Sequence, residues 1–242
     1  MFEGKVALVT GSSQGIGQVI ATKFAEYGAD VVVHGLGATD DCKTCQDIRA
    51  MGRKTAAYDV DITNVEAVNE MVKDIIAKFG KIDILINNAG MYPAMLVTDV
   101  TEKHFDRVIA VNLKGTFFVT QAVVNQSMIP NNYGRIVNIS SCDGKTPASG
   151  VAIYGAAKAG VISLTKSFAL ELADYAGWRA KQRAARAEGA VQSMEEAVAA
   201  ARGVPADDIV ILNMRDQGLE LYGNAVMASE KFIAEKPEAV RG

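Results

Sequence analysis

The sequence predicts an α/β protein in which helices cover both faces of a parallel sheet. Short apolar segments, often rich in β-branched residues, alternate with longer segments of helical pattern, and a glycine-rich turn follows the first apolar segment. Parallel strands require helical crossovers of this kind, and both faces of the sheet are then buried. The composition agrees, since 49% hydrophobic and 22% charged residues are typical of a globular chain.

Five strands are expected in the first 175 residues. Each is a short, largely apolar run, which suits a strand that is buried on both faces. The runs cover residues 5–9, 30–34, 54–58, 82–86 and 135–139. Their alternation with helices predicts right-handed crossovers, and hence a three-layer, doubly wound Rossmann-like fold.

Four helices are expected between and after these strands. The helical patterns cover residues 16–27, 64–79, 101–128 and 154–175. Gly28 ends the first helix and Gly80 ends the second, as glycine commonly does after a last turn. Thr101 is a candidate N-cap for the third helix, and Pro130 stops it.

The composition changes near Gly177. We therefore divide the chain into a domain over residues 1–175 and an atypical, mostly helical segment over residues 176–242. Residues 179–202 are rich in alanine and charged side chains, which favour a helix. Further along, the patterns predict a turn, a strand and a helix at Pro205, residues 209–212 and residues 225–235.

Charge and composition argue against several classes of protein. The 25 Lys and Arg residues against 28 Asp and Glu give a net charge of −3, which disfavours nucleic acid as the main partner. No run reaches the roughly 18 apolar residues that a membrane span needs, and the N-terminus lacks a secretory-signal pattern. Three cysteines form no disulfide framework. We therefore expect a cytoplasmic protein without a membrane partner.

The glycine-rich turn, Thr10-Gly-Ser-Ser-Gln-Gly-Ile-Gly17, lies between the first strand and the first helix. Gly11 permits a tight turn, Gly15 lets the backbone approach a pyrophosphate, and Gly17 lets the helix pack close to the strand. The unpaired N–H groups and the positive dipole end of the helix favour phosphate groups. The turn therefore predicts a dinucleotide site at the end of the first strand.

Tyr154 and Lys158 are four residues apart, so they lie on one face of the last predicted helix. A free tyrosine has a pKa near ~10 and is a poor base at neutral pH. A nearby ammonium group stabilises the tyrosinate and lowers its pKa, as proton transfer requires. Ser140 and Ser141 end the fifth strand, and Asn112 lies in the third predicted helix.

These motifs together resemble those of the short-chain dehydrogenase/reductase family over about residues 3–175. Two further stretches complete the resemblance, Asp59-Val60 after the third strand and Asn87-Asn-Ala-Gly90 after the fourth. The chain is similar to the 3-oxoacyl-ACP reductases and 3-hydroxybutyrate dehydrogenases of that family. The resemblance implies an oxidoreductase that transfers a hydride between a nicotinamide cofactor and a secondary alcohol or ketone, for example a 3-hydroxy or 3-oxo acyl compound.

The resemblance also implies roles for single residues. Tyr154 is the general acid or base, and Ser141 hydrogen-bonds the reacting oxygen, with Ser140 as the alternative serine. Lys158 binds the nicotinamide ribose and Asn112 anchors a water. The residues implied in cofactor binding are Gly11, Ser13, Gln14, Gly15, Ile16, Gly17, Leu36, Asp59, Val60, Asn88, Ala89, Gly90, Tyr154 and Lys158.

The end of the second strand favours NAD as the cofactor, with NADP as the alternative. His34-Gly-Leu-Gly37 supplies no Arg or Lys for a 2′-phosphate, and Gln14 stands where NADP-linked relatives often carry Arg. The stretch is similar to that of the NAD-linked 3-hydroxybutyrate dehydrogenases. His34 itself is either a weak cation or simply a strand-end residue.

Cys42 and Cys45 form a Cys-x-x-Cys pair. A zinc site needs more ligands than the sequence places near them, so no metal is expected. We interpret the pair as two thiols on a helix face, with a redox role as the alternative. Met91 and Met95 follow the fourth strand, where they either line an apolar pocket or pack in the core.

The resemblance stops after the helix that carries Lys158. The family's sixth strand, substrate-covering loop and last strand have no counterpart, and residues 209–212 are the candidate for the vacant place beside the fifth strand. Residues 203–242 instead resemble part of a nitrate/taurine-type ABC-transporter substrate-binding protein, through Leu219 to Asn224 and Ala228 to Arg241.

Two other functions therefore stand beside the oxidoreductase. One is a nucleotide-binding protein with little or no catalysis, because the substrate lid is missing. The other is a solute-binding module, suggested by the resemblance of the last residues. The partner expected for the oxidoreductase is a small alcohol or ketone, and a homodimer or homotetramer is the expected assembly.

Overall fold

The computed structural model describes residues 1–172, 210–213 and 225–228. Its main sheet has five parallel strands in the order β3-β2-β1-β4-β5. Their bounds are Val6–Val9 (β1), Asp30–His34 (β2), Thr55–Tyr58 (β3), Ile84–Asn87 (β4) and Arg135–Asn138 (β5). The strand order reverses between β1 and β4, which opens a crevice at the carboxyl ends of these strands.

The five predicted strands and their parallel pairing are confirmed. In the register of the sheet, Val9 of β1 lies opposite Val33 of β2 and Ile86 of β4. Successive side chains of a strand point to opposite faces, so Leu8 belongs to one apolar cluster and Val9 to another. The β1 strand is therefore buried on both sides, as its continuous apolar sequence predicts.

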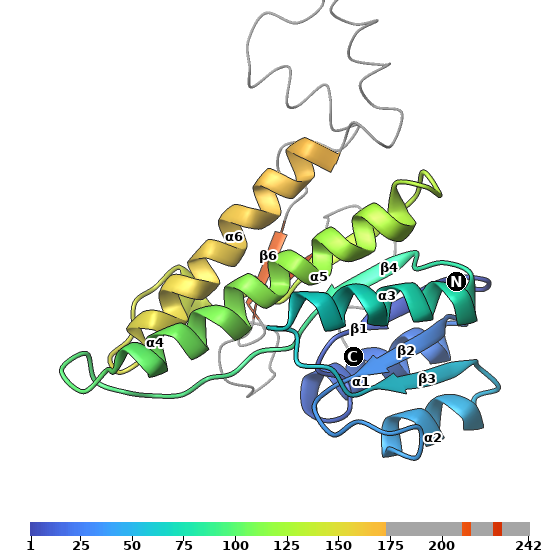
Figure 1. Ribbon diagram of the computed structural model, residues 1–242, viewed down its shortest axis with the longest axis horizontal. Coiled ribbons are helices and arrows are strands. Elements are labelled where there is room, and N and C mark those ends of the chain that lie inside the picture. The colour runs from blue at the N-terminus through green and yellow to red at the C-terminus, as the bar shows by residue number, and fades with distance from the viewer. Residues whose placement is uncertain (173–209, 214–224, 229–242) are drawn as a thin grey trace, which may run out of the picture.

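Helices cover both faces of the sheet (Figure 1). On one face lie α1 (Gly15–Glu26) and α2 (Lys43–Ala50), and on the other lie α3 (Val65–Phe79) and the long helix that contains α5 (Thr116–Val123). The first pair buries Ala21, Ala25, Cys45 and Ile48, and the second buries Val68, Val72, Val119 and Val123. The predicted three-layer Rossmann-like architecture is confirmed.

The long helix is a single rod built from four segments. It comprises α4 (Glu102–Ile109), a π-helical turn η1 (Ala110–Gly115), α5, and a second π-helical turn η2 (Val124–Met128). Among the described residues it is the one helix long and apolar enough to cross a membrane, but 56% of its most apolar window is buried inside the protein. Such burial is what a core helix also shows, so length and composition decide nothing about a membrane here.

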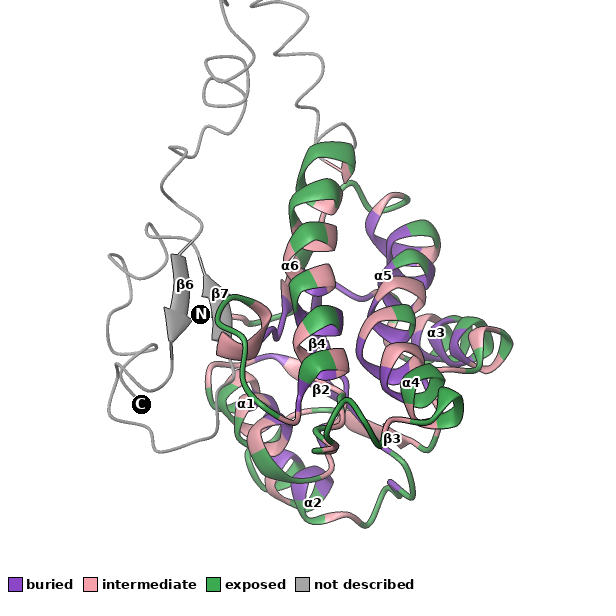
Figure 2. Cartoon of the chain, turned by 90° about the vertical axis from the view of Figure 1, so that its left-hand side faces the viewer, coloured by how far each residue is buried: buried purple, intermediate pink, exposed green. Residues whose placement is uncertain are grey.

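Helix α6 (Ala152–Leu172) packs against α4 and η1 and against β5. Two hydrogen bonds fix α6 to β5 and to the residues just after it. Asn138 Nδ2 donates to Thr165 Oγ1 at 2.9 Å, and the Ser140 hydroxyl donates to the Lys158 carbonyl at 2.9 Å. The buried residues of α6 all lie in its first half (Figure 2). The start of this helix is therefore fixed against the sheet without any further strand.

Three predicted helix boundaries are confirmed by their caps. The Asn64 side chain accepts from the Ala67 N–H at the start of α3, and the Thr101 hydroxyl accepts from the His104 N–H at the start of α4. Gly80 ends α3 in a left-handed conformation with a φ of 84°. Helix α2 was not among the predicted helical ranges, although the interpretation of Cys42 and Cys45 as helix-face thiols implied a helix at this position.

The described part of the C-terminal segment corrects two expectations. Strands β6 (Val210–Asn213) and β7 (Ala225–Ala228) form their own antiparallel sheet, so the first does not extend the five-stranded sheet beside β5. The helix expected over residues 225–235 is wrong for its first four residues. Alanine and methionine favour a helix by less than about 1 kcal/mol per residue, and strand pairing with β6, which satisfies the backbone of β7, overrides that preference.

The remaining C-terminal expectations lie outside the described residues. They are the helix over residues 179–202, the turn at Pro205, residues 173–175 of the last long helix, and residues 229–235 of the helix expected after β7. The resemblance of residues 203–242 to a transporter substrate-binding protein stays a prediction, since most of that range is also undescribed.

Candidate functional site

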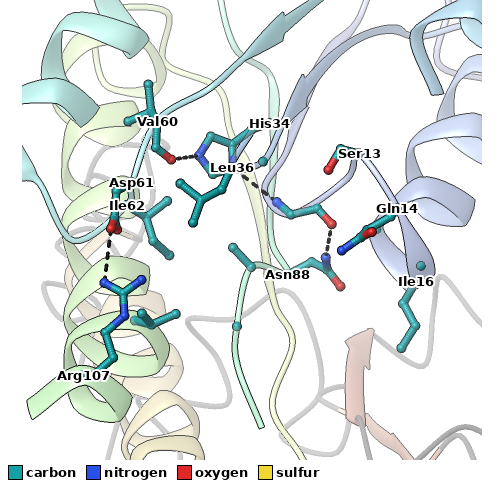
Figure 3. Close-up of a pocket in the computed structure, with 17 residues that line it drawn as sticks. Ser13, Gln14, Ile16, His34, Leu36, Val60, Asp61, Ile62, Asn88 and Arg107 are labelled. Atoms are coloured by element: carbon teal, nitrogen blue, oxygen red, sulfur yellow. Dashed lines mark hydrogen bonds and ion pairs between the residues drawn. The ribbon is translucent and has the colours of Figure 1, made fainter. Parts of the chain in front are cut away.

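The crevice between β1 and β4 contains a cavity of about 420 Å³ (Figure 3). Of the residues implied in cofactor binding by sequence, those that line it are Gly11, Ser13, Gln14, Gly15, Ile16, Gly17, Leu36, Val60, Asn88, Ala89 and Gly90. The structure adds His34, Gly35, Asp61, Ile62, Arg107 and Val111. The loops after β1, β2, β3 and β4 and the long helix thus meet around one cavity.

The glycine-rich turn needs glycine where its backbone is crowded. A Cβ on Gly17 would lie 2.2 Å from the Gly11 carbonyl oxygen and 2.5 Å from Asn88 Nδ2. Gly11 has a φ of 63°, in the left-handed region, and a Cβ there would lie 2.8 Å from the Cα of Ala89. These contacts agree with the tight turn and the close packing that the sequence predicts.

Two polar side chains connect this turn to the loop after β4. Asn88 Nδ2 donates to the carbonyl oxygens of Thr10 and Gly11, at 2.9 and 3.0 Å. The Thr10 hydroxyl accepts from the backbone N–H groups of Asn88 and Ala89, both at 3.0 Å. The two loops therefore form one rigid wall of the cavity.

Helix α1 begins at this wall with its N-terminus open toward the cavity. Gln14 is the N-cap residue, its side chain makes no capping hydrogen bond, and the first turn carries no acidic residue. The backbone N–H groups of a first turn have no partner within the helix, and the dipole concentrates positive charge there. The geometry is that of an anion site.

His34 holds the ends of three strands together. The Gly11 N–H donates to its Nδ1 at 3.2 Å, and its Nε2 contacts the Val60 carbonyl oxygen at 2.9 Å. A backbone N–H can only donate and a carbonyl can only accept, so the ring is neutral and carries its proton on Nε2. Burial lowers the pKa of His34, an effect partly offset by the hydrogen bond to Val60. The weak-cation interpretation is therefore excluded, and the strand-end interpretation holds.

The opposite side of the cavity contains one ion pair. Arg107 of α4 lies 3.2 Å from an oxygen of Asp61, which follows β3. Burial raises the pKa of Asp61, but hydrogen bonds from Thr63 and Arg107 outweigh it and lower the pKa overall. Arg107 was missed from the sequence, because nothing in its spacing indicates that α4 reaches this cavity. Asp59, which was expected in cofactor binding, does not line the cavity and accepts from the Gly37 N–H at 2.8 Å.

A second cluster of predicted residues lies on α6 and after β5. Tyr154 and Lys158 are both buried, at 5% and 4% exposure, and the Lys158 Nζ lies 5.7 Å from the centre of the Tyr154 ring. The Ser141 hydroxyl is hydrogen-bonded to Tyr154, whereas the Ser140 hydroxyl is engaged by the Lys158 carbonyl. The geometry thus brings Ser141, rather than Ser140, to the tyrosine.

The ionisation of this cluster differs from the sequence expectation. Burial raises the pKa of Tyr154, and the hydrogen bond from Ser141 only partly opposes it. Burial also lowers the pKa of Lys158 to about 8. The expected lowering of the tyrosine pKa is absent in this state because the lysine Nζ donates to the Ile139 carbonyl oxygen at 2.7 Å rather than to the phenol.

Asn112 lies in the π-helical turn η1 and is fully buried. Its Oδ1 accepts from the Met91 N–H at 3.1 Å, and its Nδ2 donates to the carbonyls of Met91 and Val108 at 3.0 and 3.1 Å. These bonds connect the loop after β4 to the long helix. π-Helical turns are frequent at functional sites because they displace a side chain from the regular helix face.

Gly90 connects the cavity to this cluster. It lines the cavity, and a Cβ on it would lie 2.8 Å from Asn112 Oδ1 and 3.6 Å from Lys158 Nζ. Tyr154 and Lys158, which the sequence also implied in cofactor binding, do not line the cavity themselves, and Gly90 lies between the cavity and their cluster. Among the described residues, no three His, Cys, Asp or Glu side chains gather as metal ligands.

Comparisons with known proteins agree with this geometry. Residues 5–176 match the family model of the short chain dehydrogenases. The chain is 44% identical over 175 residues to the (2S)-[(R)-hydroxy(phenyl)methyl]succinyl-CoA dehydrogenase subunit BbsD of Thauera aromatica, covering 70% of this chain and 68% of that protein. It is 40% identical over 171 residues to the 3-oxoacyl-[acyl-carrier-protein] reductase FabG of Thermotoga maritima, covering 71% and 69%.

Solved structures give the same result. An NAD⁺-bound xylitol dehydrogenase is 40% identical with a TM-score of 0.68, over 72% of this chain and 67% of that one. A metagenomic short-chain oxidoreductase in complex with NADP is 34% identical with a TM-score of 0.68, over 72% and 79%. The family match ends at residue 176, so none of the C-terminal segment after it is included.

Proposed function

The chain belongs to the short-chain dehydrogenase family and is an NAD(P)-dependent oxidoreductase, and we propose that it uses NAD to interconvert a secondary alcohol and a ketone at Tyr154. The observation that supports this best is the meeting of two features at Gly90. Gly90 lines the cavity at which the open N-terminus of α1 lies, and it also lies next to Lys158 of the buried Tyr154–Lys158 cluster.

The residues present fit a dinucleotide. The place where a Cβ on Gly17 would lie is filled by backbone and by Asn88, so the loop closes tightly while the first turn of α1 keeps its N–H groups for phosphate. Val60, Ile62 and Val111 supply an apolar surface for an adenine ring on the far side of the cavity. When bound, the nicotinamide supplies the hydride chemistry, and the protein orients it and manages the proton.

Tyr154 handles that proton in our proposal. In the direction of reduction, its hydroxyl and that of Ser141 donate hydrogen bonds to the substrate oxygen, and the phenol proton passes to that oxygen as charge develops. In the direction of oxidation, the same phenol oxygen takes the proton back. Ser141 lies close enough to serve both, since it already hydrogen-bonds the tyrosine.

Lys158 and Asn112 support this step in different ways. Below its pKa of about 8, Lys158 carries its proton, and we propose that this charge, 5.7 Å from the centre of the Tyr154 ring, turns toward the phenol and stabilises a tyrosinate during the reaction. Its ammonium group has three donors and gives one to Ile139, which leaves two for the ribose hydroxyls. Asn112 holds the Met91 backbone and lies beside Gly90, and we propose that it anchors a water that relays protons toward Lys158.

NAD is favoured over NADP by the charges around the cavity. Gly35, Leu36 and Gly37 follow β2 without a charged side chain, and His34 is neutral and occupied. Arg107 is the one Arg or Lys among the lining residues, and it is paired with Asp61. A 2′-phosphate would therefore meet no unpaired cation at the second strand. Similar solved structures contain either cofactor, since one holds NAD⁺ and another holds NADP.

The substrate class is proposed from the relatives. A succinyl-CoA dehydrogenase subunit and 3-oxoacyl-[acyl-carrier-protein] reductases are among them, so we propose a 3-hydroxy or 3-oxo acyl compound. We also propose a cytoplasmic homodimer or homotetramer that has neither a nucleic-acid nor a membrane partner. The function is assigned to residues 1–175, with residues 176–242 as an appended segment.

A titration of the full chain with NADH and, separately, NADPH tests the cofactor proposal. Nicotinamide fluorescence should report binding of NADH that is tighter than that of NADPH. Steady-state turnover with a panel of ketones and 3-oxoacyl thioesters then tests catalysis, with Tyr154→Phe as the inactive control. Tighter binding of NADPH would overturn the NAD assignment.

A second function, nucleotide binding with little or no turnover, is favoured by one specific observation. The match to the family ends at residue 176, and the matched residues cover only 68% and 69% of the lengths of the two relatives. The same pair of experiments separates the two functions. NADH binding together with turnover no higher than that of Tyr154→Phe would identify the binding protein.

A further inference from the structure

The loop after β2 places two thiols at the start of α2. Cys42 is the N-cap residue, and Cys45 follows at the third helical position. Side chains at these two positions face each other across the first turn, which is the geometry that a capping box uses. Cys42 is partly exposed, whereas Cys45 has 0% exposure. The expected pair of helix-face thiols is therefore a cap and a core residue.

The two thiols differ in the way that a dithiol switch requires. Cys42 is reachable from solvent, and it faces an α2 N-terminus that has no side-chain cap and no acidic residue in its first turn. Burial raises the pKa of the Cys45 thiol to about 12, with a hydrogen bond to Cys42 among the contributions. Cys42 can thus attack a disulfide in solution, whereas Cys45 stays protonated until Cys42 has reacted.

One of the two residues between them, Thr44, contacts the proposed cofactor site. The Thr44 hydroxyl is buried and donates to the Ser12 carbonyl at 2.9 Å, with the Ser13 carbonyl at 3.3 Å. Both carbonyls belong to the glycine-rich turn. A change of geometry in the first turn of α2 is thereby transmitted directly to the wall of the cavity.

We propose that Cys42 and Cys45 form a reversible disulfide with a low-molecular-weight disulfide as the oxidant, and that its formation weakens dinucleotide binding through Thr44. A disulfide brings the sulfurs to about 2.05 Å and the Cβ atoms to roughly 3.8 Å. Cys45 must then turn away from Thr55, whose hydroxyl now lies 3.7 Å from its sulfur. Thr44, which lies between the two cysteines, is displaced from the turn. The effect on cofactor binding rests on the function proposed above.

The chemistry balances as two thiol–disulfide exchanges. The Cys42 thiolate attacks one sulfur of the small disulfide and expels a thiolate, which forms a mixed disulfide at Cys42. The expelled thiolate accepts the proton of Cys45. The Cys45 thiolate then attacks the Cys42 sulfur and expels the second small thiolate, which accepts a proton from solvent. The protein dithiol loses two electrons, and the small disulfide is reduced to two thiols.

The test equilibrates the full chain with mixtures of reduced and oxidised glutathione, traps free thiols by alkylation, and locates the disulfide by peptide mass. NADH affinity is measured on each form by fluorescence. We expect a Cys42–Cys45 linked peptide, with Cys142 still alkylated, and NADH binding roughly fivefold or more weaker, the scale of one lost hydrogen bond. Dithiothreitol should restore binding.

Three variants complete the experiment. Cys42→Ser keeps an N-cap side chain and should abolish the response, and Cys45→Ser should do the same. Cys142→Ser is the matched control and should respond like the wild type. Absence of the linked peptide under excess oxidised glutathione overturns the proposal, as does a disulfide that leaves NADH affinity unchanged.

Failure of the function proposed above gives a different result. If the reduced protein binds no NADH, the linked peptide still decides whether the disulfide forms. The contact through Thr44 is then read from amide hydrogen exchange of residues 11–17. Faster exchange in the oxidised form supports the proposal, and equal exchange overturns it.

Discussion

Acidification should destabilise the protein through one buried histidine. The ring of His34 is 2% exposed, and it accepts from the Gly11 N–H while it donates to the Val60 carbonyl. A second proton could only go to Nδ1, where it would oppose the Gly11 N–H and place a charge in the core. Burial therefore lowers the pKa of His34 from its ordinary value of 6.5, although Val60, Asp59 and Asp61 oppose part of the shift.

The sign and size of the effect follow from proton linkage. Above pH 6.5 the histidine is neutral in both the folded and the unfolded chain, so its contribution to stability is complete. As the pH falls below 6.5, His34 binds a proton in the unfolded chain but stays neutral in the folded chain, until the pH reaches the lowered pKa of the folded state. The free energy of unfolding falls in this window by at most about 1.4 kcal/mol per pH unit.

Urea unfolding at pH 7.5 and pH 5.5 measures this loss in the wild type and in His34→Gln. The glutamine amide also offers an acceptor and a donor, but it does not titrate. Taking the difference between the two proteins cancels the titration of all other groups. The wild type should lose more stability than His34→Gln on acidification, by up to about 1.4 kcal/mol. His104→Gln removes the other histidine and should follow the wild type. Equal losses of unfolding free energy in the wild type and in His34→Gln would show that His34 is not held neutral between Gly11 and Val60.

Three further predictions concern the proposed site. Gly17→Ala should weaken NADH binding at least roughly tenfold, because its Cβ would lie 2.2 Å from the Gly11 oxygen. Gly52→Ala is the control, since a Cβ at Gly52 meets no atom within 4 Å. It should cost about 1 kcal/mol of stability and leave NADH binding unchanged in the same titration. Tyr154→Phe should reduce kcat by about 10² to 10⁴ while NADH still binds, and equal turnover in steady-state assays would contradict its role. Leu36→Arg, at a side chain that is 65% exposed, should improve NADPH affinity relative to NADH without a change in thermal stability, and an unchanged ratio in paired titrations would place the 2′-hydroxyl elsewhere.

The sheet and most of the cavity could be predicted from sequence because their signals are local. A strand such as β1 is a continuous apolar run, and the glycines at Gly11 and Gly17 occur where the backbone has no room for a side chain. The spacing to Tyr154 favoured Ser141 over Ser140 as the serine beside the tyrosine, and in the structure Ser141 is hydrogen-bonded to Tyr154. In each case neighbours in the chain already determine the geometry.

What the sequence missed depends on contacts between distant elements. Arg107 reaches the cavity only because the long helix crosses beside the loop that carries Asp61. The bridge made by His34 requires the ends of β1 and β3 to lie on either side of β2. The pKa of Tyr154 depends on the orientation of Lys158 toward Ile139, which a four-residue spacing does not specify. Such features depend on how distant elements pack, so the hydrophobic periodicity of the sequence does not predict them.

The way in which α6 is fixed bears on what the C-terminal segment can affect. Tyr154 and Lys158 lie on the half of α6 that is hydrogen-bonded to the end of β5 through Ser140, and Asn138 of β5 is in turn bonded to Asn87 of β4. These contacts all lie within the first 172 residues, and they require no strand beyond β5. Within the described residues, the contacts that hold the Tyr154–Lys158 cluster therefore involve no strand beyond β5. A defect caused by the unusual segment should thus increase the KM for the alcohol or ketone, while the affinity for NADH stays that of an intact site.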